Sequence, residues 1–366
     1  MSETEFLIGL DFLGAGNLGD DLMVAGFLEG IRHLGLAGKM RQLRALCSHD
    51  RSSQEHRFPQ IEWIDGKQAD LRSEAIKNAD VLLGIGGTAF QVTSGTWLLE
   101  NMEEVVAGKD SSAPLILVNV GSETEARREE GRCRTLMRQI SRLSTRDKDT
   151  LTLLSEWRDG DHSPSLIPGA DLANISLPEL CASHPPLDRR PNEVGVILGS
   201  DTLSRDDVEE VIKWIISDKR PVSWITCEVR NIHGGEYHTY RRNRHRFGGR
   251  FFNWWRPRVT LHRPDYHSCS LTDLVQPFAE CKTILSSRYH GILSAAWSGC
   301  RVAGIARSSK VKWLCQQLRI PMIEPPIRRE EIILLQRDAI VVDRSLLGQF
   351  RELAIQGVDG LRLSEC

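Results

Sequence analysis

Short apolar runs alternate with helix-like segments along the first half of the chain. The apolar runs lie at 6–12, 81–84 and 115–120. The segments that follow them repeat apolar residues every three to four positions, at 22–34, 97–106 and 127–137. Continuous apolar runs are typical of strands buried on both faces, and the alternation is that of βαβ units. We therefore expect a parallel sheet covered by helices.

A second series of the same kind begins after a segment rich in turn residues, 184–192. Strands are predicted at 194–198, 222–227, 283–286 and 302–305. A helix is predicted at 206–216, and a second one begins at the capping box formed by Ser270 and Asp273. Two more helices are predicted at 291–297 and 311–318. The pattern predicts an α/β protein with two Rossmann-like domains, 1–185 and 190–340, facing a central cleft. A helix in 341–366 is expected to pack back on the first domain.

One segment, 230–263, departs from this alternation. It holds nine arginines and a single acid, Glu236, interleaved with aromatic residues that include Trp254 and Trp255. Its spacing fits neither a helix nor a strand, so we expect a long loop. Aromatic rings stack on sugars and arginines pair with anions, which favours an acidic or diphosphate-lipid-linked saccharide as a ligand that stacks on Trp254 and Trp255. Single-stranded RNA and a peripheral contact with an anionic membrane are the alternatives.

The composition of the chain excludes several classes of binding partner and of site. The 366 residues include 47 Lys+Arg and 49 Asp+Glu, a formal net charge of −2, which argues against bulk nucleic-acid binding. No apolar run reaches the roughly 18–20 residues of a membrane-spanning helix, and the first residues are acidic, unlike a signal peptide, so we expect a cytoplasmic protein. The nine cysteines are scattered without a C-x-x-C pair, so we expect no disulfide framework, no zinc site and no catalytic thiol.

The first strand runs into a glycine motif, Gly14–Asp21, that contains G-x-G-x-x-G. A dinucleotide site would need an acid about 20 residues later, where the chain instead has Lys39, Met40 and Arg41. Asp20 and Asp21 would also repel a pyrophosphate at the start of the following helix. The acids either complement the helix dipole or hydrogen-bond to a sugar hydroxyl and accept its proton.

Two further turns follow predicted strands of the first half. The glycine turn at 84–87 and Thr88 allow a close approach of the backbone to a ligand, or form a tight turn only. Arg146 follows a strand predicted at 140–143 and is expected either to bind a carboxylate or phosphate or to be a surface arginine. Asp147 is expected to begin a helix at 150–157.

The second half contains the densest group of basic residues. Arg288 and His290 follow the strand at 283–286, a helix begins at Gly291, and Lys310 follows the next strand. Extended geometry would point Arg288 and His290 to the same side, and the helix N-terminus would add backbone N–H donors. The group predicts a site for one small, multiply charged anion. The alternative is a structural arginine beside a buried histidine.

These residues together resemble the polysaccharide pyruvyl transferase family. The resemblance follows the chain through 16–21, 84–87, 145–147, Gly169-Ala170-Asp171, 287–291 and Lys310. It implies a fold like that of two-domain B-type glycosyltransferases, with phosphoenolpyruvate as co-substrate, a saccharide acceptor and neither cofactor nor metal. Arg146, Arg288, His290, Gly291 and Lys310 would bind the donor. His290 would be the general acid, Asp20 and Asp21 would accept hydroxyl protons, and Asn17, Gly87, Thr88 and Asp171 would contact the acceptor.

Two other functions remain compatible with the same architecture. A nucleotide-sugar glycosyltransferase would also need a basic site in the second domain, but it would need an acid for the ribose, and none follows Arg288 closely. A non-catalytic saccharide-binding protein would have no need for four basic or titrating groups at one site. The sequence specifies neither the acceptor sugar, which could be lipid-linked, nor an oligomeric state.

Overall fold

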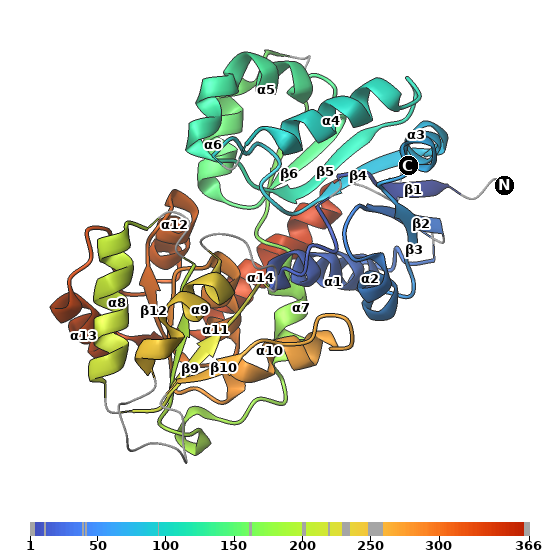
Figure 1. Cartoon of the computed structure of the whole chain (residues 1–366). Coiled ribbons are helices and arrows are strands. Elements are labelled where there is room, and N and C mark those ends of the chain that lie inside the picture. Colours follow the sequence, from blue (N-terminus) through green and yellow to red (C-terminus); the bar gives the residue numbers. More distant parts are fainter. Residues whose placement is uncertain are drawn as a thin grey trace. The chain divides into compact units, whose positions relative to one another are not determined.

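The computed structural model describes residues 4–361, apart from 11, 39, 41, 94, 161–162, 200–202, 219, 229–234 and 248–258. The chain forms two compact units (Figure 1). Unit 1 comprises 1–15, 19–176 and 348–366, and unit 2 comprises 16–18 and 177–347. The boundaries fall inside the helices α7 (Ala173–Leu180) and α14 (Arg344–Asp359).

Unit 1 is built on a seven-stranded parallel sheet in the order β3-β2-β1-β4-β5-β6-β7. Its strands are β1 (Glu5–Ile8), β2 (Gln42–Cys47), β3 (Glu62–Asp65), β4 (Val81–Ile85), β5 (Leu115–Val120), β6 (Arg142–Thr145) and β7 (Leu166–Pro168). All residues of β4 and β5 are buried, as their continuous apolar sequences predict.

Helices cover both faces of this sheet. They are α1 (Leu18–His33), α2 (Arg51–Arg57), α3 (Ala69–Asn78), α4 (Trp97–Gly108), η1 (Thr124–Glu129), α5 (Glu130–Met137) and α6 (Lys148–Trp157). Figure 1 shows α3 to α6 along one face and α1 and α2 on the other. The part of α14 that belongs to unit 1 packs beside α1, where Gly30 lies against Val358.

Unit 2 repeats this design. Its sheet has the order β10-β9-β8-β11-β12-β13, and β14 pairs with β12 in the antiparallel sense. The strands are β8 (Val194–Ile197), β9 (Val222–Ile225), β10 (Val259–His262), β11 (Thr283–Ser286), β12 (Arg301–Ile305), β13 (Met322–Ile323) and β14 (Ile340–Val341). The helices are η3 (Leu187–Arg189), α8 (Arg205–Ser217), α9 (Glu236–Phe247), α10 (Leu271–Ala279), α11 (Tyr289–Trp297), α12 (Ser309–Gln317) and α13 (Arg329–Asp338).

In both units the strand order reverses at one point, between β1 and β4 and between β8 and β11. Ligands of open α/β sheets bind outside the carboxyl ends of the strands at such a point. The described parts of the loops there are 9–10, 12–15, 86–93 and 95–96 in unit 1, and 16–17, 198–199, 203–204 and 287–288 in unit 2. These loops contain the glycine motifs and Arg288, so the topology places the sequence motifs where ligands of this fold class bind.

Most predicted elements of the alternating pattern are confirmed. The strands at 115–120 and 283–286 have the predicted limits, and the capping box of Ser270 and Asp273 opens α10. Asp147 caps α6, its side chain accepting a hydrogen bond from the backbone N–H of Thr150 at 2.7 Å. The predicted domain limits, 1–185 and 190–340, differ from the observed division because α7 and α14 cross the boundary.

The prediction of a long loop over 230–263 is wrong for its described part. Residues 236–247 form α9 and 259–262 form β10. Tyr240 and Phe247 lie two helical turns apart and pack on Trp224 of β9, each with its ring centroid 5.9 Å from that of Trp224. The other buried positions of α9, Glu236, Thr239 and Asn243, are polar, so the helix has too few apolar positions for its period to be detected from the sequence.

Asn119 fixes the carboxyl edge of the unit 1 sheet. This fully buried residue has a positive φ of 49° at the end of β5. Its N–H donates to Ser144 Oγ at 2.8 Å, that hydroxyl donates back to Asn119 Oδ1, and Asn119 Nδ2 donates to the carbonyl of Ala354 in α14. A buried amide must be hydrogen-bonded on both sides, so Asn119 ties β5, β6 and α14 together.

Replacing Gly357 by Ala should disrupt this connection. An added Cβ would lie 2.1 Å from Asn119 Oδ1. We expect Gly357→Ala to lower the free energy of unfolding by about 1–3 kcal/mol, as overpacking does. Gly348 lies in the same helix with nothing within 4 Å of an added Cβ. Gly348→Ala should therefore stabilise by about 0.5–1 kcal/mol. Urea unfolding of both variants tests this, and equal effects would contradict it.

Candidate functional site

The carboxyl edge of the unit 2 sheet brings the predicted basic residues onto neighbouring loops. β11 and β12 pair in parallel, with Ser286 opposite Gly304. Arg288 is the N-cap residue of α11, which follows β11, and His290 lies in the first turn of that helix. Arg307 follows β12, and Lys310 lies in the first turn of α12. Adjacent parallel strands thus present two helix N-termini and their basic side chains at one edge.

The start of α11 corrects the local geometry expected for Arg288 and His290. The helix begins at Tyr289 rather than Gly291, so the two residues are not on one extended segment. His290 is half-buried and its ring lies edge-on to Tyr289, with centroids 5.1 Å apart. Gly291 is enclosed, because an added Cβ would meet Ser286 Oγ at 2.7 Å. The glycine therefore allows the helix to start close against β11.

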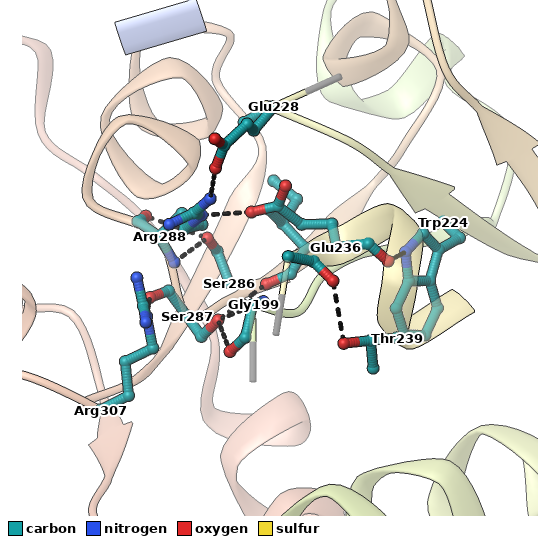
Figure 2. Close-up of polar contacts among 12 residues, drawn as sticks. Gly199, Trp224, Glu228, Glu236, Thr239, Ser286, Ser287, Arg288 and Arg307 are labelled. Carbon is teal, nitrogen blue, oxygen red and sulfur yellow. Dashed lines mark hydrogen bonds and ion pairs between the residues drawn. The ribbon is translucent and has the colours of Figure 1, made fainter. Parts of the chain in front are cut away.

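Arg288 binds two buried carboxylates (Figure 2). Its Nη2 donates to Glu228 Oε2 at 2.5 Å, and its Nε donates to Glu236 Oε1. Glu228 and Glu236 are 3% and 0% exposed, whereas the Arg288 side chain is 20% exposed. Ion pairs at such positions orient the guanidinium and compensate its charge. The positive charge that faces an anion at this edge therefore has to come mainly from the neighbouring groups.

Short polar contacts hold the surrounding turns. Ser287 Oγ accepts from the N–H of Gly199 at 3.0 Å and so joins the loops after β8 and β11. Arg307 Nε donates to the carbonyl of Ser287 at 2.8 Å and joins the loops after β11 and β12. Figure 2 shows these contacts next to the Arg288 pair. The three loops at the reversal of strand order are thus held as one framework.

Asn17 belongs to this same framework. It forms an isolated antiparallel bridge with Glu228, and the N–H of Leu18 donates to the carbonyl of Cys227 at 2.8 Å. Residues 16–18 are accordingly part of unit 2, while Asp20 and Asp21 belong to unit 1. The sequence motif Gly14–Asp21 is therefore divided between the units.

In unit 1, the predicted residues gather at the ends of β4, β5 and β6. The N–H of Gly121 donates to the carbonyl of Gly87 at 2.8 Å, and Thr88 is buried. Arg146 directly follows β6, but its side chain is 3% exposed and is not a surface group. Its guanidinium lies 3.4 Å from Asp147 Oδ2 and 3.9 Å from Asp171 Oδ2. Arg146, Asp147 and Asp171 thus form a buried charged cluster beside Gly121.

Asp21 points into unit 1 and is 1% exposed. Its Oδ1 accepts from Gln54 Nε2 at 2.8 Å, and its Oδ2 lies 3.3 Å from Arg57 Nε. Burial raises the pKa of Asp21 to about 6, and Arg57 and Gln54 oppose this rise only in part. Asp20, in contrast, is half-buried. Of the two acids proposed to accept a sugar proton, Asp20 is the more accessible.

The structure brings together Arg288, His290, Gly291, Lys310 and Asn17 in unit 2, and Gly87, Thr88, Arg146 and Asp171 in unit 1. Trp254 and Trp255 lie outside the described residues. The sequence reading missed Glu228 and Glu236 as site residues. Glu236 did carry a signal, because it is the single acid among nine arginines in 230–263.

Other reactive groups contribute little at these edges. Burial raises the pKa of Cys133, Cys300 and Cys315 to about 12, so these thiols stay protonated at neutral pH. Within the described ranges, no three His, Cys, Asp or Glu side chains are placed to hold a metal ion. No helix in the described part of the chain has the length and apolar character to cross a bilayer. That the reaction needs no metal or cofactor stays a prediction.

Comparison with known proteins assigns the family. The model of the family described as polysaccharide pyruvyl transferase matches residues 17–309, so the chain belongs to this family. The match covers Asn17, Arg288, His290 and Gly291 of unit 2 and both acids of α1, and it ends one residue before Lys310. A search of curated proteins gives no significant match.

Solved structures support the fold alone. A UDP-GlcNAc 2-epimerase from Methanocaldococcus jannaschii is similar with a TM-score of 0.59, 10% identity and 99% of each chain covered. A glycosyltransferase from Rickettsia africae has a TM-score of 0.52 and 12% identity, covering 99% of this chain and 94% of its own. An alpha-glucosyltransferase bound to UDP and DNA has a TM-score of 0.51 and 9% identity, covering 98% and 95%. The chain has two Rossmann-like domains of the GT-B type.

The pKa of Asp21 predicts a pH dependence of stability. Because the folded-state pKa lies above the usual value of 3.8, the folded protein binds the extra proton between about pH 4 and 6. This contribution to stability, on the order of 3 kcal/mol, is fully present below pH 4 and is lost as the pH rises through 6. Asp21→Asn should flatten this part of the profile in urea unfolding at pH 4–7. Parallel profiles of the two proteins would contradict the assignment.

The Arg288 pair predicts a second effect on stability. Arg288→Ala leaves Glu228 and Glu236 buried without a counter-charge and should cost about 3–5 kcal/mol in unfolding free energy. Adding Glu236→Gln should recover part of the loss by removing one buried charge. Arg337 forms an exposed pair with Asp338, so Arg337→Ala should change stability by about 0.5 kcal/mol or less. An Arg288→Ala effect as small as this control would show that the buried pairs are not held as described.

Proposed function

We propose that the protein transfers pyruvate from phosphoenolpyruvate to two hydroxyls of a saccharide and forms a pyruvate ketal. Membership of the polysaccharide pyruvyl transferase family supports pyruvyl transfer in general. The observation that carries the choice of donor is the pair of helix N-termini after β11 and β12, with His290, Arg307 and Lys310 at one edge. Phosphoenolpyruvate combines a carboxylate and a phosphate on three carbons, and two basic loops suit such a compact anion.

In the proposed donor site, different groups bind the two anionic ends of phosphoenolpyruvate and orient it. Lys310 and the N-terminus of α12 hold one anionic group, and the N-terminus of α11 holds the other. Arg288, whose guanidinium is fixed by Glu228 and Glu236, orients the donor. In unit 1, Arg146 contributes through the cluster with Asp147 and Asp171.

The chemistry requires one acid and one base. His290 delivers a proton to the methylene carbon of phosphoenolpyruvate, which leaves a cationic centre at the central carbon. A sugar hydroxyl attacks that carbon and loses its proton to a carboxylate, for which Asp20 is our candidate. Phosphate then leaves with its electron pair and takes up the proton held by the carboxylate, and the second hydroxyl closes the ketal and returns its proton to His290. Asn17, Gly87, Thr88 and Asp171 are proposed to contact the acceptor.

A nucleotide-sugar glycosyltransferase is the second candidate, because UDP is bound by a solved structure of the same fold. The compact edge of unit 2 favours the smaller donor. We place the reaction in the cytoplasm, where phosphoenolpyruvate is available, with a saccharide acceptor of cell-surface polysaccharide synthesis.

Calorimetric titration with phosphoenolpyruvate tests the donor. We expect Lys310→Ala to weaken binding about tenfold or more, because a charge-assisted hydrogen bond is lost. Lys312 lies in the same helix and pairs with the exposed Glu324 at 3.0 Å, so Lys312→Ala is the matched control and should leave binding unchanged. His290→Ala should depress turnover more than donor binding.

The same titration is repeated with UDP-glucose. Binding of UDP-glucose together with no binding of phosphoenolpyruvate would overturn the proposal and favour a glycosyltransferase. An equal loss in Lys310→Ala and Lys312→Ala would remove Lys310 from the donor site.

A further inference from the structure

A cavity lies between α8 and α9 of unit 2 (Figure 1 shows both helices). It has a volume of about 370 Å³, within the range of small-molecule sites. The first half of α8 with the residues before it forms one wall, and α9 forms the other with residues between 238 and 246. None of the donor residues proposed above lines it, so it is a separate feature of this unit.

The charged groups of the cavity are mostly positive. Its cationic and titrating side chains are Arg205, His238, Arg242, His245 and Arg246, and its single acid is Glu209. Glu209 binds Arg246 through both carboxylate oxygens, at 2.6 and 2.8 Å. The ion pair lowers the pKa of Glu209, so the acid stays ionised and holds the Arg246 fork in place.

Arg205 and Arg242 differ from Arg246 in their partners. Both are exposed, and neither takes part in an ion pair with another side chain that the structure describes. They come from different helices, so two guanidinium forks meet one cavity from opposite walls. A guanidinium fork matches the oxygen pairs of phosphate and carboxylate groups.

The remaining lining suits the uncharged part of a ligand. Leu203 and Val208 provide apolar contact, and Thr239 and Asn243 provide polar atoms. The hydroxyl of Thr239 donates to the carbonyl of Gly235, and Asn243 Nδ2 donates to the carbonyl of Thr239, both at 3.0 Å. These internal bonds fix the wall while the amide oxygen of Asn243 remains near Arg246 Nη1, at 3.5 Å. A sugar ring, with one apolar face and a hydroxyl rim, fits such a lining.

We propose that this cavity binds the phosphate or diphosphate group of a saccharide ester, with Arg205 and Arg242 as the anion-binding residues. That this ester is the pyruvyl acceptor rests on the proposed function; the binding itself does not. The anion binds between Arg205 and Arg242, which belong to separate helices. Arg246, whose guanidinium is held by Glu209, is the third arginine of the site. Carboxylated sugars present a single charge per group and fit the arginine cluster less well than a dianionic phosphate.

Calorimetry with inorganic pyrophosphate tests the site. The full-length chain carrying Lys310→Ala serves as the background, so that binding at the donor edge is weakened. Arg242→Gln and Arg205→Gln should each weaken pyrophosphate binding about tenfold or more. Arg244 is exposed on the same helix and does not line the cavity, so Arg244→Gln is the matched control and should change binding less than twofold. Thermal unfolding confirms that each variant folds.

Two further arms identify the source of the phosphate. Glucose 1-phosphate is titrated as a soluble ester, and vesicles of phosphatidylcholine with a polyprenyl diphosphate are used as a lipid-linked one. A loss of binding to either ligand in Arg242→Gln, but not in Arg244→Gln, supports the site and identifies its ligand.

Absence of binding to all three probes would overturn the proposal, as would equal losses in Arg242→Gln and Arg244→Gln, which indicate a general surface charge. Phosphoenolpyruvate binding by Arg242→Gln in the otherwise native chain reports on the donor separately. A failed donor and a failed cavity are therefore distinguishable.

Discussion

Two buried carboxylates share one guanidinium at the reversal of strand order in unit 2. Glu228 follows β9, Glu236 begins α9, and Arg288 caps α11, so a single set of ion pairs joins the start of α11 to two acids that lie 60 and 52 residues earlier in the chain. Taking ionised groups out of water is costly, and each of the three is tolerated only because the others are present. The position of α9, the bridge from Glu228 to Asn17 and the start of α11 all depend on this arrangement.

The ion pairs of Arg288 with Glu228 and Glu236 also reduce the positive charge that Arg288 offers to an anion. An arginine facing water would bind an anion by its net charge, whereas Arg288 is compensated by two acids and contributes mainly orientation. In the proposed donor site, the positive charge that attracts the anion would come from Lys310, Arg307 and the N-termini of α11 and α12, which follow the adjacent parallel strands β11 and β12. In unit 1, Arg146 is compensated in a similar way by Asp147 and Asp171. In both units the arginine is held by acids before any ligand arrives, which favours a site of fixed geometry.

α9 connects the donor edge with the cavity beside α8. Glu236 at its first position binds Arg288, and its middle and last turns provide Arg242 and Arg246. Tyr240 and Phe247 bury the opposite side of the same helix on Trp224. One amphipathic helix therefore has three separate uses: an ion pair at its start, a packed aromatic face, and a cationic face.

The sequence by itself determined the two α/β halves, because strands buried on both faces must be continuously apolar and helices between them must repeat every 3.6 residues. It also located Arg288, His290 and Lys310, since strand ends and helix starts can be identified from local signals such as Asp147 and the Ser270 capping box. Only the tertiary structure decided which charges are compensated. Arg288 lies 52 residues from Glu236 and 60 residues from Glu228 along the chain, and Asp21 is paired with Gln54 and Arg57 of another helix. No local pattern encodes such contacts, because burial and ion pairing depend on the neighbours that folding brings together.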